Sequence, residues 1–293
     1  MIIKMNCGEI EMHNIKIITD STCDLTAEIF NSNGISFVPL YVNFNDLMYK
    51  DLLEISTVEV FKMVGEYNKL PKTSAPSPAD FCNAFKPYID NGQDIIYIGL
   101  SSMISSTINN ANMAANEFPP GRIEIIDSRN LSSGIGLLVL KAIDYIKDGM
   151  ELNEVADKVR KLTPKVRTAF AIDTLDYLYK GGRCSALQNF ASGVFKIKPI
   201  ISVVGGKMIV REKVRGNEKK VLNRLVNSVL DNKDNIDLSR IIITHSMSKD
   251  NADFLKSELE SKIRAEEILI TDAGCVISSH CGPNTIGILY IEK

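Results

Sequence analysis

The sequence is poor in the side chains that most often carry catalysis or hold metal ions. It contains only three histidines, His13, His245 and His280, and no tryptophan. Its six cysteines form no Cys-x-x-Cys pair and stand at no zinc-ligand spacing from a histidine; they lie at positions 7, 23, 82, 184, 275 and 281. His280 and Cys281 are adjacent, which is poor geometry for two ligands of one metal ion. We therefore predict free thiols and no metal site.

Long apolar runs and an excess of charge of one sign are also absent. No apolar stretch approaches the ~20 residues of a membrane-spanning helix, so we expect no integral membrane segment. The first residues carry Lys4, Glu9 and Glu11 and lack the apolar region of a signal peptide. The formal net charge is -2, without the basic footprint that is typical of nucleic-acid binding. We predict a globular protein in the cytoplasm, with no nucleic-acid partner.

The motifs of the common nucleotide-dependent and serine-dependent enzymes are missing as well. The sequence has no P-loop and no Gly-x-Gly-x-x-Gly after a strand. It has no Gly-x-Ser-x-Gly nucleophile elbow. No acidic cluster indicates a Mg²⁺ ion bound with phosphate. The residues alone therefore show no obvious catalytic machinery.

What is present is an alternation of short apolar strands and amphipathic helices. Over residues 15–163 they follow one another with short connections, which predicts a parallel sheet covered by helices. Over residues 164–293 the pattern changes, and two strands joined by Gly205-Gly206 indicate an antiparallel hairpin. We therefore predict an α/β protein of two domains: an N-terminal parallel-sheet α/β domain (15–163) and a C-terminal α+β domain (164–293). An extension (1–14) precedes them.

The most informative stretch runs from Asp94 to Asn110. Asp94–Leu100 has the apolar, β-rich composition of a buried strand, and from Ala111 the chain is Ala-rich and helical. Between them lie five hydroxyl side chains: Ser101, Ser102, Ser105, Ser106 and Thr107. The carboxyl end of a strand beside a helix N-terminus favours an anion. Helix capping explains one or two of the hydroxyls, so an ordinary cap and an anion site both stay open.

Two further segments carry polar or small residues at positions where a helix begins. Asp20–Leu25 follows the first strand, and its Ser21 or Thr22 is expected to cap the next helix. Gly134 and Gly136 lie near the start of a helix predicted over 131–147, where small residues allow close packing or close approach of a ligand.

Two more polar segments are candidates for a site. Lys72–Pro78 is expected to be a rigid polar loop, because its prolines restrict the backbone and so hold Thr73 and Ser74 in fixed positions. His280 precedes a Gly-Pro turn just before the last strand. An ordinary loop and a lone structural histidine explain the same residues without any ligand.

Seven short motifs in a fixed order give the chain a resemblance to a known family. They are Asp20-Ser21-Thr22-Cys23-Asp24-Leu25, Thr73-Ser74-x-Pro76-Ser77, Ser101-Ser102-x-x-Ser105-x-Thr107, Gly181-Gly182-Arg183, Ile197-Lys198-Pro199-Ile200, Val214-Arg215-Gly216 and His280-x-Gly282-Pro283. Each motif is weak alone, whereas the series is specific. From about Lys16 onward the chain resembles the DegV family of bacterial fatty-acid-binding proteins, which includes the binding subunits of fatty acid kinase.

The resemblance implies an acyl chain buried between the two domains, with its carboxylate held by hydroxyls and a histidine. The ligand-binding residues carried over are Thr73, Ser74, Ser105, Ser106, Thr107 and His280. Arg183 and Arg215 match positions that are expected to shape the pocket or a partner surface. Ser106 stands where the family usually has glycine, so the approach of the backbone to the head group is expected to differ.

The resemblance also implies a function and a partner. A long-chain fatty acid is expected as the bound ligand, with no cofactor, and its carboxylate would be presented to a separate ATP-dependent fatty acid kinase subunit for acyl-phosphate formation. Each buried CH₂ contributes about 0.8 kcal/mol, and each hydrogen bond to a charged head group roughly 1.5–3 kcal/mol. The tail therefore supplies the affinity and the polar residues the orientation.

Two other functions stay open on the sequence. One is a serine-type esterase or thioesterase that uses Ser105 and His280, although the nucleophile elbow is absent. The other is a sensor or interaction protein that binds a different small anion in the same pocket.

Overall fold

The N-terminal half is built around a parallel sheet. The computed structural model describes residues 14–183 and 197–293. The sheet has the strand order β2–β1–β6–β7, and every pairing in it is parallel. Its strands are β1 (Ile15–Asp20), β2 (Ser36–Val38), β6 (Asp94–Gly99) and β7 (Ile123–Asp127). This confirms the parallel arrangement predicted for the first half of the chain.

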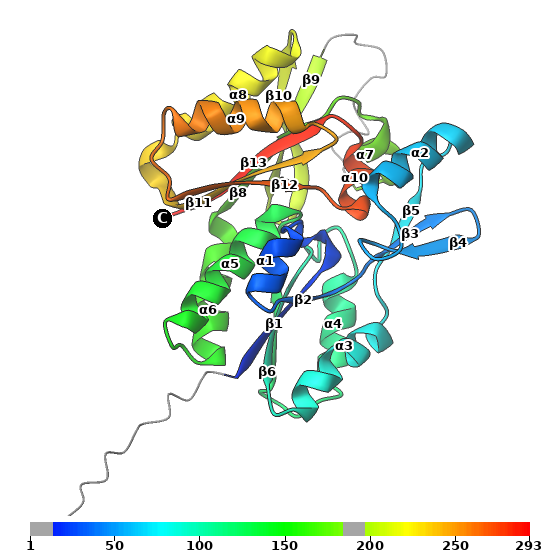
Figure 1. Cartoon of the computed structure of the whole chain (residues 1–293), viewed down its shortest axis with the longest axis vertical. Coiled ribbons are helices and arrows are strands. Elements are labelled where there is room, and N and C mark those ends of the chain that lie inside the picture. Colours follow the sequence, from blue (N-terminus) through cyan, green and yellow to red (C-terminus); the bar gives the residue numbers. More distant parts are fainter. Residues whose placement is uncertain (1–13, 184–196) are drawn as a thin grey trace, which may run out of the picture.

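Helices cover both faces of this sheet (Figure 1). On one face α3 and α4 pack through a buried cluster that includes Phe81, Phe85 and Tyr97. The other face carries α1, α5 and α6. The helices are α1 (Ala27–Ser32), α3 (Pro78–Asp90), α4 (Thr107–Ala115), α5 (Ser133–Lys147) and α6 (Leu152–Leu162).

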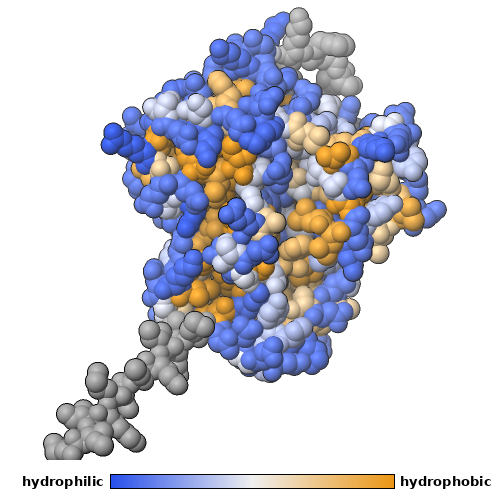
Figure 2. Space-filling view, in the orientation of Figure 1, coloured by the Kyte–Doolittle hydropathy of each residue, from blue (hydrophilic) through white to orange (hydrophobic). Residues whose placement is uncertain are grey.

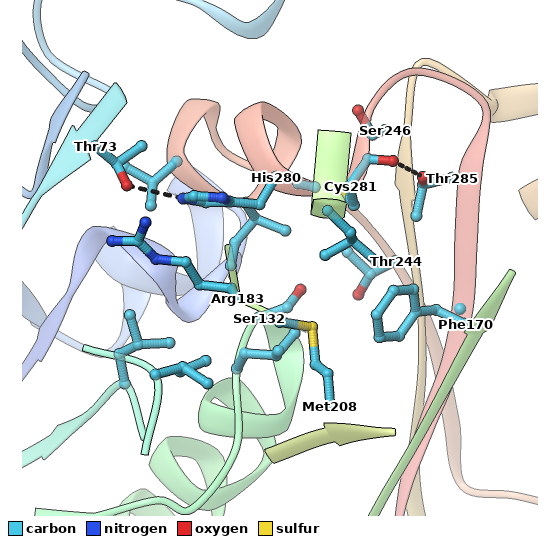
Figure 3. A pocket seen from close by; sticks show the side chains of 18 of the residues that line it. Thr73, Ser132, Phe170, Arg183, Met208, Thr244, Ser246, His280, Cys281 and Thr285 are labelled. Atoms are coloured by element: carbon cyan, nitrogen blue, oxygen red, sulfur yellow. Dashed lines mark hydrogen bonds between the residues drawn. The ribbon is translucent and has the colours of Figure 1, made fainter. Parts of the chain in front are cut away.

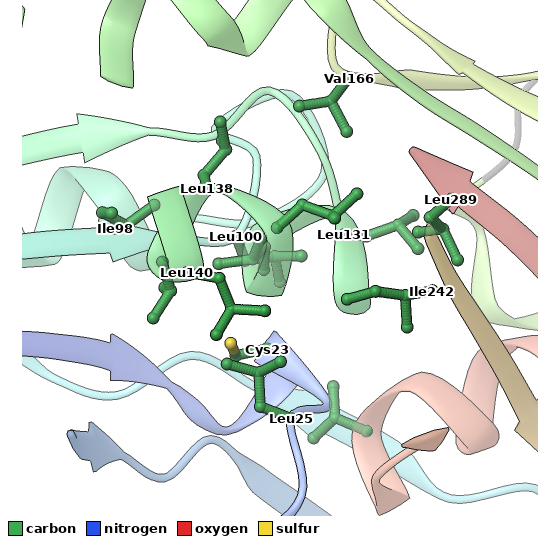
Figure 4. Close-up of a cluster of buried hydrophobic side chains, with 14 of the residues drawn as sticks. Cys23, Leu25, Ile98, Leu100, Leu131, Leu138, Leu140, Val166, Ile242 and Leu289 are labelled. Atoms are coloured by element: carbon green, nitrogen blue, oxygen red, sulfur yellow. The ribbon is translucent and has the colours of Figure 1, made fainter. Parts of the chain in front are cut away.

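Helix α5 lies between the two halves of the molecule and is buried over most of its length. It packs against β1 and β6 on one side and against β8, β11 and β13 on the other. Figure 4 shows Leu138 and Leu140 of α5 among side chains from both halves. A helix that is apolar on all sides is typical of such a central position. Each fully buried leucine there contributes about 1.5–3 kcal/mol.

The glycines at the start of α5 serve close packing. A Cβ atom on Gly134 would lie 2.3 Å from Asn130 Oδ1, and one on Gly136 would lie 2.8 Å from Leu25 Cδ2. The absence of a side chain at Gly136 therefore lets α5 approach the segment that follows β1, and its absence at Gly134 leaves room for Asn130 in the loop before α5.

The C-terminal half contains a six-stranded sheet of mixed direction, in the order β10–β9–β8–β13–β11–β12. Only the β11–β12 pairing is parallel. Helices α8 and α9 cover the face that points away from α5. The elements are β8 (Val166–Ala171), β9 (Ile197–Val204), β10 (Lys207–Arg215), β11 (Ile236–Ser246), β12 (Glu267–Asp272), β13 (Thr285–Glu292), α8 (Glu218–Leu230) and α9 (Lys249–Glu260).

The hairpin predicted at Gly205-Gly206 is confirmed. These residues join the antiparallel strands β9 and β10 and have φ values of 57° and 85°. Two consecutive left-handed residues suit the twist of a two-residue hairpin. The sequence therefore placed the antiparallel element of the second half correctly.

A small antiparallel sheet, in the order β4–β3–β5, extends from the N-terminal half toward the C-terminal half (Figure 1). It consists of β3 (Tyr41–Phe44), β4 (Leu47–Lys50) and β5 (Lys72–Ser74), and α2 (Thr57–Tyr67) connects β4 to β5. Lys72–Pro78 was expected to be loop throughout, which is wrong at its start, because Lys72–Ser74 pair with Tyr41–Asn43. The side chain of Thr73 is thus held by a strand.

Two expectations at helix ends are corrected, and one further helix was not foreseen. Ser21–Cys23 form a 3₁₀ turn, and the Thr26 side chain caps α1, so neither Ser21 nor Thr22 is the cap. Helix α4 starts at Thr107, earlier than Ala111. The segment before the Gly-Pro turn is itself a helix, α10 (Cys275–Cys281), and it packs against α7 (Asp176–Gly181), α2, β3 and β5.

Other features concern the described residues alone. Cys23, Cys82, Cys275 and Cys281 are free thiols, whereas Cys7 and Cys184 lie outside residues 14–183 and 197–293. Within these ranges no three metal-ligating side chains come together. No helix in the same ranges combines the length and apolar character needed to cross a membrane.

Candidate functional site

A cavity lies between the two halves of the molecule. The void between its lining atoms measures about 860 Å³, including the part that opens to solvent. Much of the wall is apolar and comes from both halves, with Leu100, Leu131, Phe170, Met208, Val276 and Leu289 among its residues.

Several hydroxyls in the wall are already bonded within the protein. Thr168 Oγ1 donates to Asn130 Oδ1 at 2.8 Å, and Thr285 Oγ1 donates to the carbonyl oxygen of Cys281 at 2.9 Å. Ser246 Oγ donates to a neighbouring serine, and Ser132 Oγ donates to Asp24. Because these protons are used, these four hydroxyls offer no free donor to a ligand.

One end of the cavity is different, because two polar side chains face each other there. Thr73 Oγ1 lies 2.8 Å from His280 Nε2. Thr73 comes from β5 and His280 from the last turn of α10, and in Figure 3 the guanidinium group of Arg183 lies beside the pair. Phe170 and Met208 lie on the opposite side of the same view. The cavity therefore has a polar end and an apolar end.

His280 is neutral at physiological pH. Burial and the nearby positive charge of Arg183 lower the pKa of the imidazole to about 4. Its Nδ1 atom is buried without a hydrogen-bond partner. A Cβ atom on Gly181 would lie only 2.4 Å from this nitrogen, so α7 closes over it.

The environment of the ring also selects its tautomer. Buried N–H groups without an acceptor are rarer than buried acceptors without a donor. We therefore assign the proton to Nε2, which donates to Thr73 Oγ1. The hydroxyl proton of Thr73 is then free to be donated to an anion, and Arg183 supplies positive charge nearby.

Ser74 and Ser105 also line the cavity. Ser74 is exposed, and its Oγ accepts from Asn43 Nδ2 at 3.2 Å. Ser105 is half-buried, and its Oγ lies 2.8 Å from Thr107 Oγ1. Thr73, Ser74, Ser105, Arg183 and His280, all singled out in the sequence, thus come together around one cavity.

The remaining sequence candidates lie elsewhere. Ser106 is exposed at the start of α4 and makes no capping hydrogen bond, while Thr107 is buried; neither lines the cavity. Arg215 is exposed at the end of β10, also away from the cavity lining. Any role of these three residues stays a prediction.

The five hydroxyls of residues 101–107 do not all face one site. Ser101 Oγ donates to the carbonyl oxygen of Gly206 at 2.9 Å, and Ser102 Oγ donates to Asp127 Oδ2 at 2.6 Å. Internal bonds therefore explain part of a pattern that the sequence presented as a possible anion site.

Two aspartates that no site prediction included support the helix that carries His280. Asp24 Oδ1 accepts from the Gly274 N–H and Asp51 Oδ1 accepts from the Cys275 N–H, both at 2.9 Å. Burial raises the pKa of Asp51 to about 6, although its hydrogen bonds act in the opposite direction. Asp24 belongs to the Asp20–Leu25 motif, which was a usable signal, whereas nothing near Asp51 in the sequence marked it.

The geometry does not match that of a serine hydrolase. His280 Nε2 is bonded to Thr73, and no hydrogen bond links it to Ser105. Its second ring nitrogen has no carboxylate to orient it. Within the described residues, Ser105 and His280 are therefore not arranged as the nucleophile and base of a catalytic triad.

Comparison with known proteins agrees with this architecture. A family model described as "uncharacterised protein, DegV family" matches residues 14–293. A DegV domain-containing protein of Clostridium acetobutylicum is 34% identical over 283 residues, which is 96% of this chain and 100% of the relative. One from Caldanaerobacter subterraneus is 32% identical over 282 residues, with the same coverage.

Solved structures show the same fold. A DegV family protein from Thermus thermophilus, described as binding fatty acid, aligns with a TM-score of 0.88 and 31% identity over 96% of this chain and 100% of that one. A stearic acid-binding protein from Eubacterium ventriosum aligns with a TM-score of 0.83 and 26% identity over 95% and 98% of the two chains. The chain described here belongs to the DegV family.

Proposed function

We propose that this protein binds one long-chain fatty acid, with its tail in the apolar part of the cavity and its carboxylate at Thr73, Ser105 and His280. The observation that carries the proposal is the Thr73–His280 pair, 2.8 Å apart, at the polar end of an otherwise largely apolar cavity. A buried carboxylate is costly unless several donors converge on it. Thr73 supplies a hydroxyl proton, and Arg183 supplies positive charge.

Two relatives support the nature of the ligand. The Thermus thermophilus protein is described as a fatty-acid binder and the Eubacterium ventriosum protein as a stearic acid binder. The hydroxyls of the wall that donate within the protein are compatible with an apolar tail beside them, because an acyl chain forms no hydrogen bonds.

We further propose that the protein is a carrier that presents the carboxylate to a separate ATP-dependent fatty acid kinase subunit in the cytoplasm, which forms the acyl phosphate. Ser74 and Arg183 are exposed, so the polar end of the cavity lies near the surface. Six of the twelve exposed large hydrophobic side chains of the described residues fall within residues 47–67, which comprise β4, in the same small sheet as the strand that bears Thr73, and α2, which leads to that strand. Figure 2 shows apolar surface where the two halves meet, which supports a docking face near the head group.

The binding proposal is tested by comparing two ligands with the same tail, hexadecanoic acid and hexadecan-1-ol. Loss of one hydrogen bond to a charged group costs roughly 1.5–3 kcal/mol, so we expect the protein to prefer the acid by about tenfold or more. Thr73→Val and Ser105→Ala should each reduce this preference. Ser228→Ala is the matched control, because this half-buried serine of α8 does not line the cavity. Equal affinity of the unchanged protein for both ligands would contradict the proposal.

The carrier role is tested by adding an ATP-dependent fatty acid kinase and trapping acyl phosphate as the hydroxamate. We expect product only when kinase, ATP and loaded binding protein are all present. Hydrolysis of an acyl ester by the binding protein alone, abolished in Ser105→Ala, would instead establish the esterase.

A further inference from the structure

Three carboxylates are buried near the boundary between the two halves. Asp20 and Asp51 are fully buried and Asp24 is 3% exposed. In residues 14–183 and 197–293 none of them forms an ion pair with a lysine, arginine or histidine. An isolated buried carboxylate is costly, so hydrogen bonds have to stabilise these groups.

Two of the three carboxylates stabilise the start of α10. The first amides of a helix have no partner within the helix, and the helix dipole favours negative charge there. Asp24 binds the Gly274 N–H and Asp51 binds the Cys275 N–H. Gly274 offers no side chain that could cap the helix itself. The caps of α10 thus come from the N-terminal half, over 200 residues away in the chain.

The second oxygen of each aspartate is also fixed. Asp51 Oδ2 accepts from Ser21 Oγ at 2.8 Å, and Ser21 Oγ in turn accepts from the Leu40 N–H at 3.0 Å. Asp24 Oδ2 accepts from Ser132 Oγ. Hydrogen bonds within the N-terminal half therefore hold both carboxylates in place, independently of their contacts with α10.

Asp20 makes a comparable set of bonds that does not include α10. It accepts from the Thr22 N–H at 3.0 Å, from Tyr97 Oη at 2.9 Å and from the Leu100 N–H at 2.8 Å. It is thus equally buried and equally well bonded but separate from the helix that carries His280.

The location of α10 decides where His280 lies. His280 is five residues after Cys275, about 7.5 Å along the helix axis at 1.5 Å per residue. Thr73 belongs to β5, in the small antiparallel sheet that extends from the N-terminal half. The 2.8 Å contact between Thr73 and His280 therefore depends on how α10 is seated against that half.

We infer that Asp24 and Asp51 are positioning residues of the head-group site. This inference rests on the fatty-acid binding proposed above. By holding the first two amides of α10 they fix His280 against Thr73. Without them the cavity still accepts a long apolar tail but no longer distinguishes a carboxylate from a hydroxyl.

The test is the ratio of affinities for hexadecanoic acid and hexadecan-1-ol. Asp24→Ala and Asp51→Ala should lower the acid preference from about tenfold or more to near unity while the alcohol still binds. Asp24→Asn and Asp51→Asn keep an acceptor for the amide and should restore most of the preference. Asp20→Ala is the matched control and should change both affinities equally, leaving the ratio as in the unchanged protein.

A second measurement guards against variants that do not fold. Ser21→Ala is a milder change that removes one bond to Asp51, and it should lower the ratio partly. His280 can be followed by NMR, since the chain has only three histidines. Release of α10 lets water reach the imidazole, so the pKa of His280 should rise toward its ordinary value in both the Asp51→Ala and Ser21→Ala proteins.

The possible outcomes distinguish failure of the proposed head-group site from failure of the positioning role of Asp24 and Asp51. No acid preference in the unchanged protein would refute the head-group site itself. A clear preference that survives in Asp24→Ala, Asp51→Ala and Ser21→Ala, with an unchanged His280 titration, would overturn the positioning role alone.

Discussion

Thr73 and His280 are separated by 207 positions in the sequence, yet they form the pair on which the proposed head-group site depends. Neither side chain is unusual by itself. Their chemistry comes from the surroundings: burial and Arg183 keep the imidazole neutral, and the enclosed Nδ1 selects the tautomer that leaves the Thr73 hydroxyl proton available. The head-group site is therefore a property of the folded environment.

The titration of His280 gives a prediction at this scale. Its pKa is about 4 in the folded protein and about 6.5 in an unfolded chain. Between these values the unfolded state binds a proton that the folded state does not. The contribution of His280 to stability is thus fully present above pH ~6.5 and is lost as pH falls toward ~4, by at most roughly 3 kcal/mol.

The measurement is the melting temperature of the wild-type protein minus that of His280→Gln, followed from pH 7 to pH 4.5. We expect this difference to decrease as pH falls. Asp51 acts in the opposite direction, because its raised pKa makes the folded state the stronger proton binder between about 4 and 6. Comparison with His280→Gln isolates the histidine, since Asp51 is present in both proteins. A difference that is independent of pH would refute the assignment.

At the scale of elements, the proposed site draws on three short ones, β5, α7 and α10, and on the turn before α4 that carries Ser105. Helix α7 contributes a close approach of backbone to the imidazole. Gly181 is its last residue, and a Cβ atom there would lie 2.4 Å from His280 Nδ1. Because Thr73 holds the ring from the other side, the imidazole has little room to move away from an added Cβ atom.

Gly181→Ala should therefore displace His280 and reduce the preference for hexadecanoic acid over hexadecan-1-ol severalfold. Gly65→Ala is the control in α2, where a Cβ atom meets nothing within 4 Å. The control should keep the ligand preference and raise stability by roughly 0.5–1 kcal/mol, because alanine favours helix more than glycine. An unchanged ligand preference in Gly181→Ala would show that the close approach has no role in the site.

These elements were also the hardest to predict from the sequence. The three residues of β5 show no alternation that could reveal a strand, and their pairing partner, β3, lies about thirty residues earlier. Helix α10 has only seven residues, and Asp24 and Asp51, its caps, are distant in the sequence. Longer elements such as β1, β6 and α5 were found because their apolar patterns are continuous. The candidate residues Thr73, Ser105 and His280 were noted from the residues alone, with ordinary explanations still open, and were assigned to a ligand by the family resemblance. Their mutual geometry required the fold.

At the scale of the whole molecule, the cavity lies at the boundary of two layered halves that share the buried helix α5 (Figures 1 and 4). Residues from both halves form its wall, and the contact between Thr73 and His280 spans the boundary. Binding of an acyl chain there would add apolar contacts between the halves. A bound fatty acid is therefore expected to stabilise the entire fold as well as to occupy a pocket.

The most direct test of the central claim is native mass spectrometry of the purified protein, followed by organic extraction and lipid analysis. We predict a mass shift that corresponds to one long-chain fatty acid per chain, with the same fatty acid recovered in the extract. Thr73→Val should carry less of it, and Ser228→Ala should carry as much as the unchanged protein. A protein that is free of lipid and takes up no added fatty acid would contradict the account.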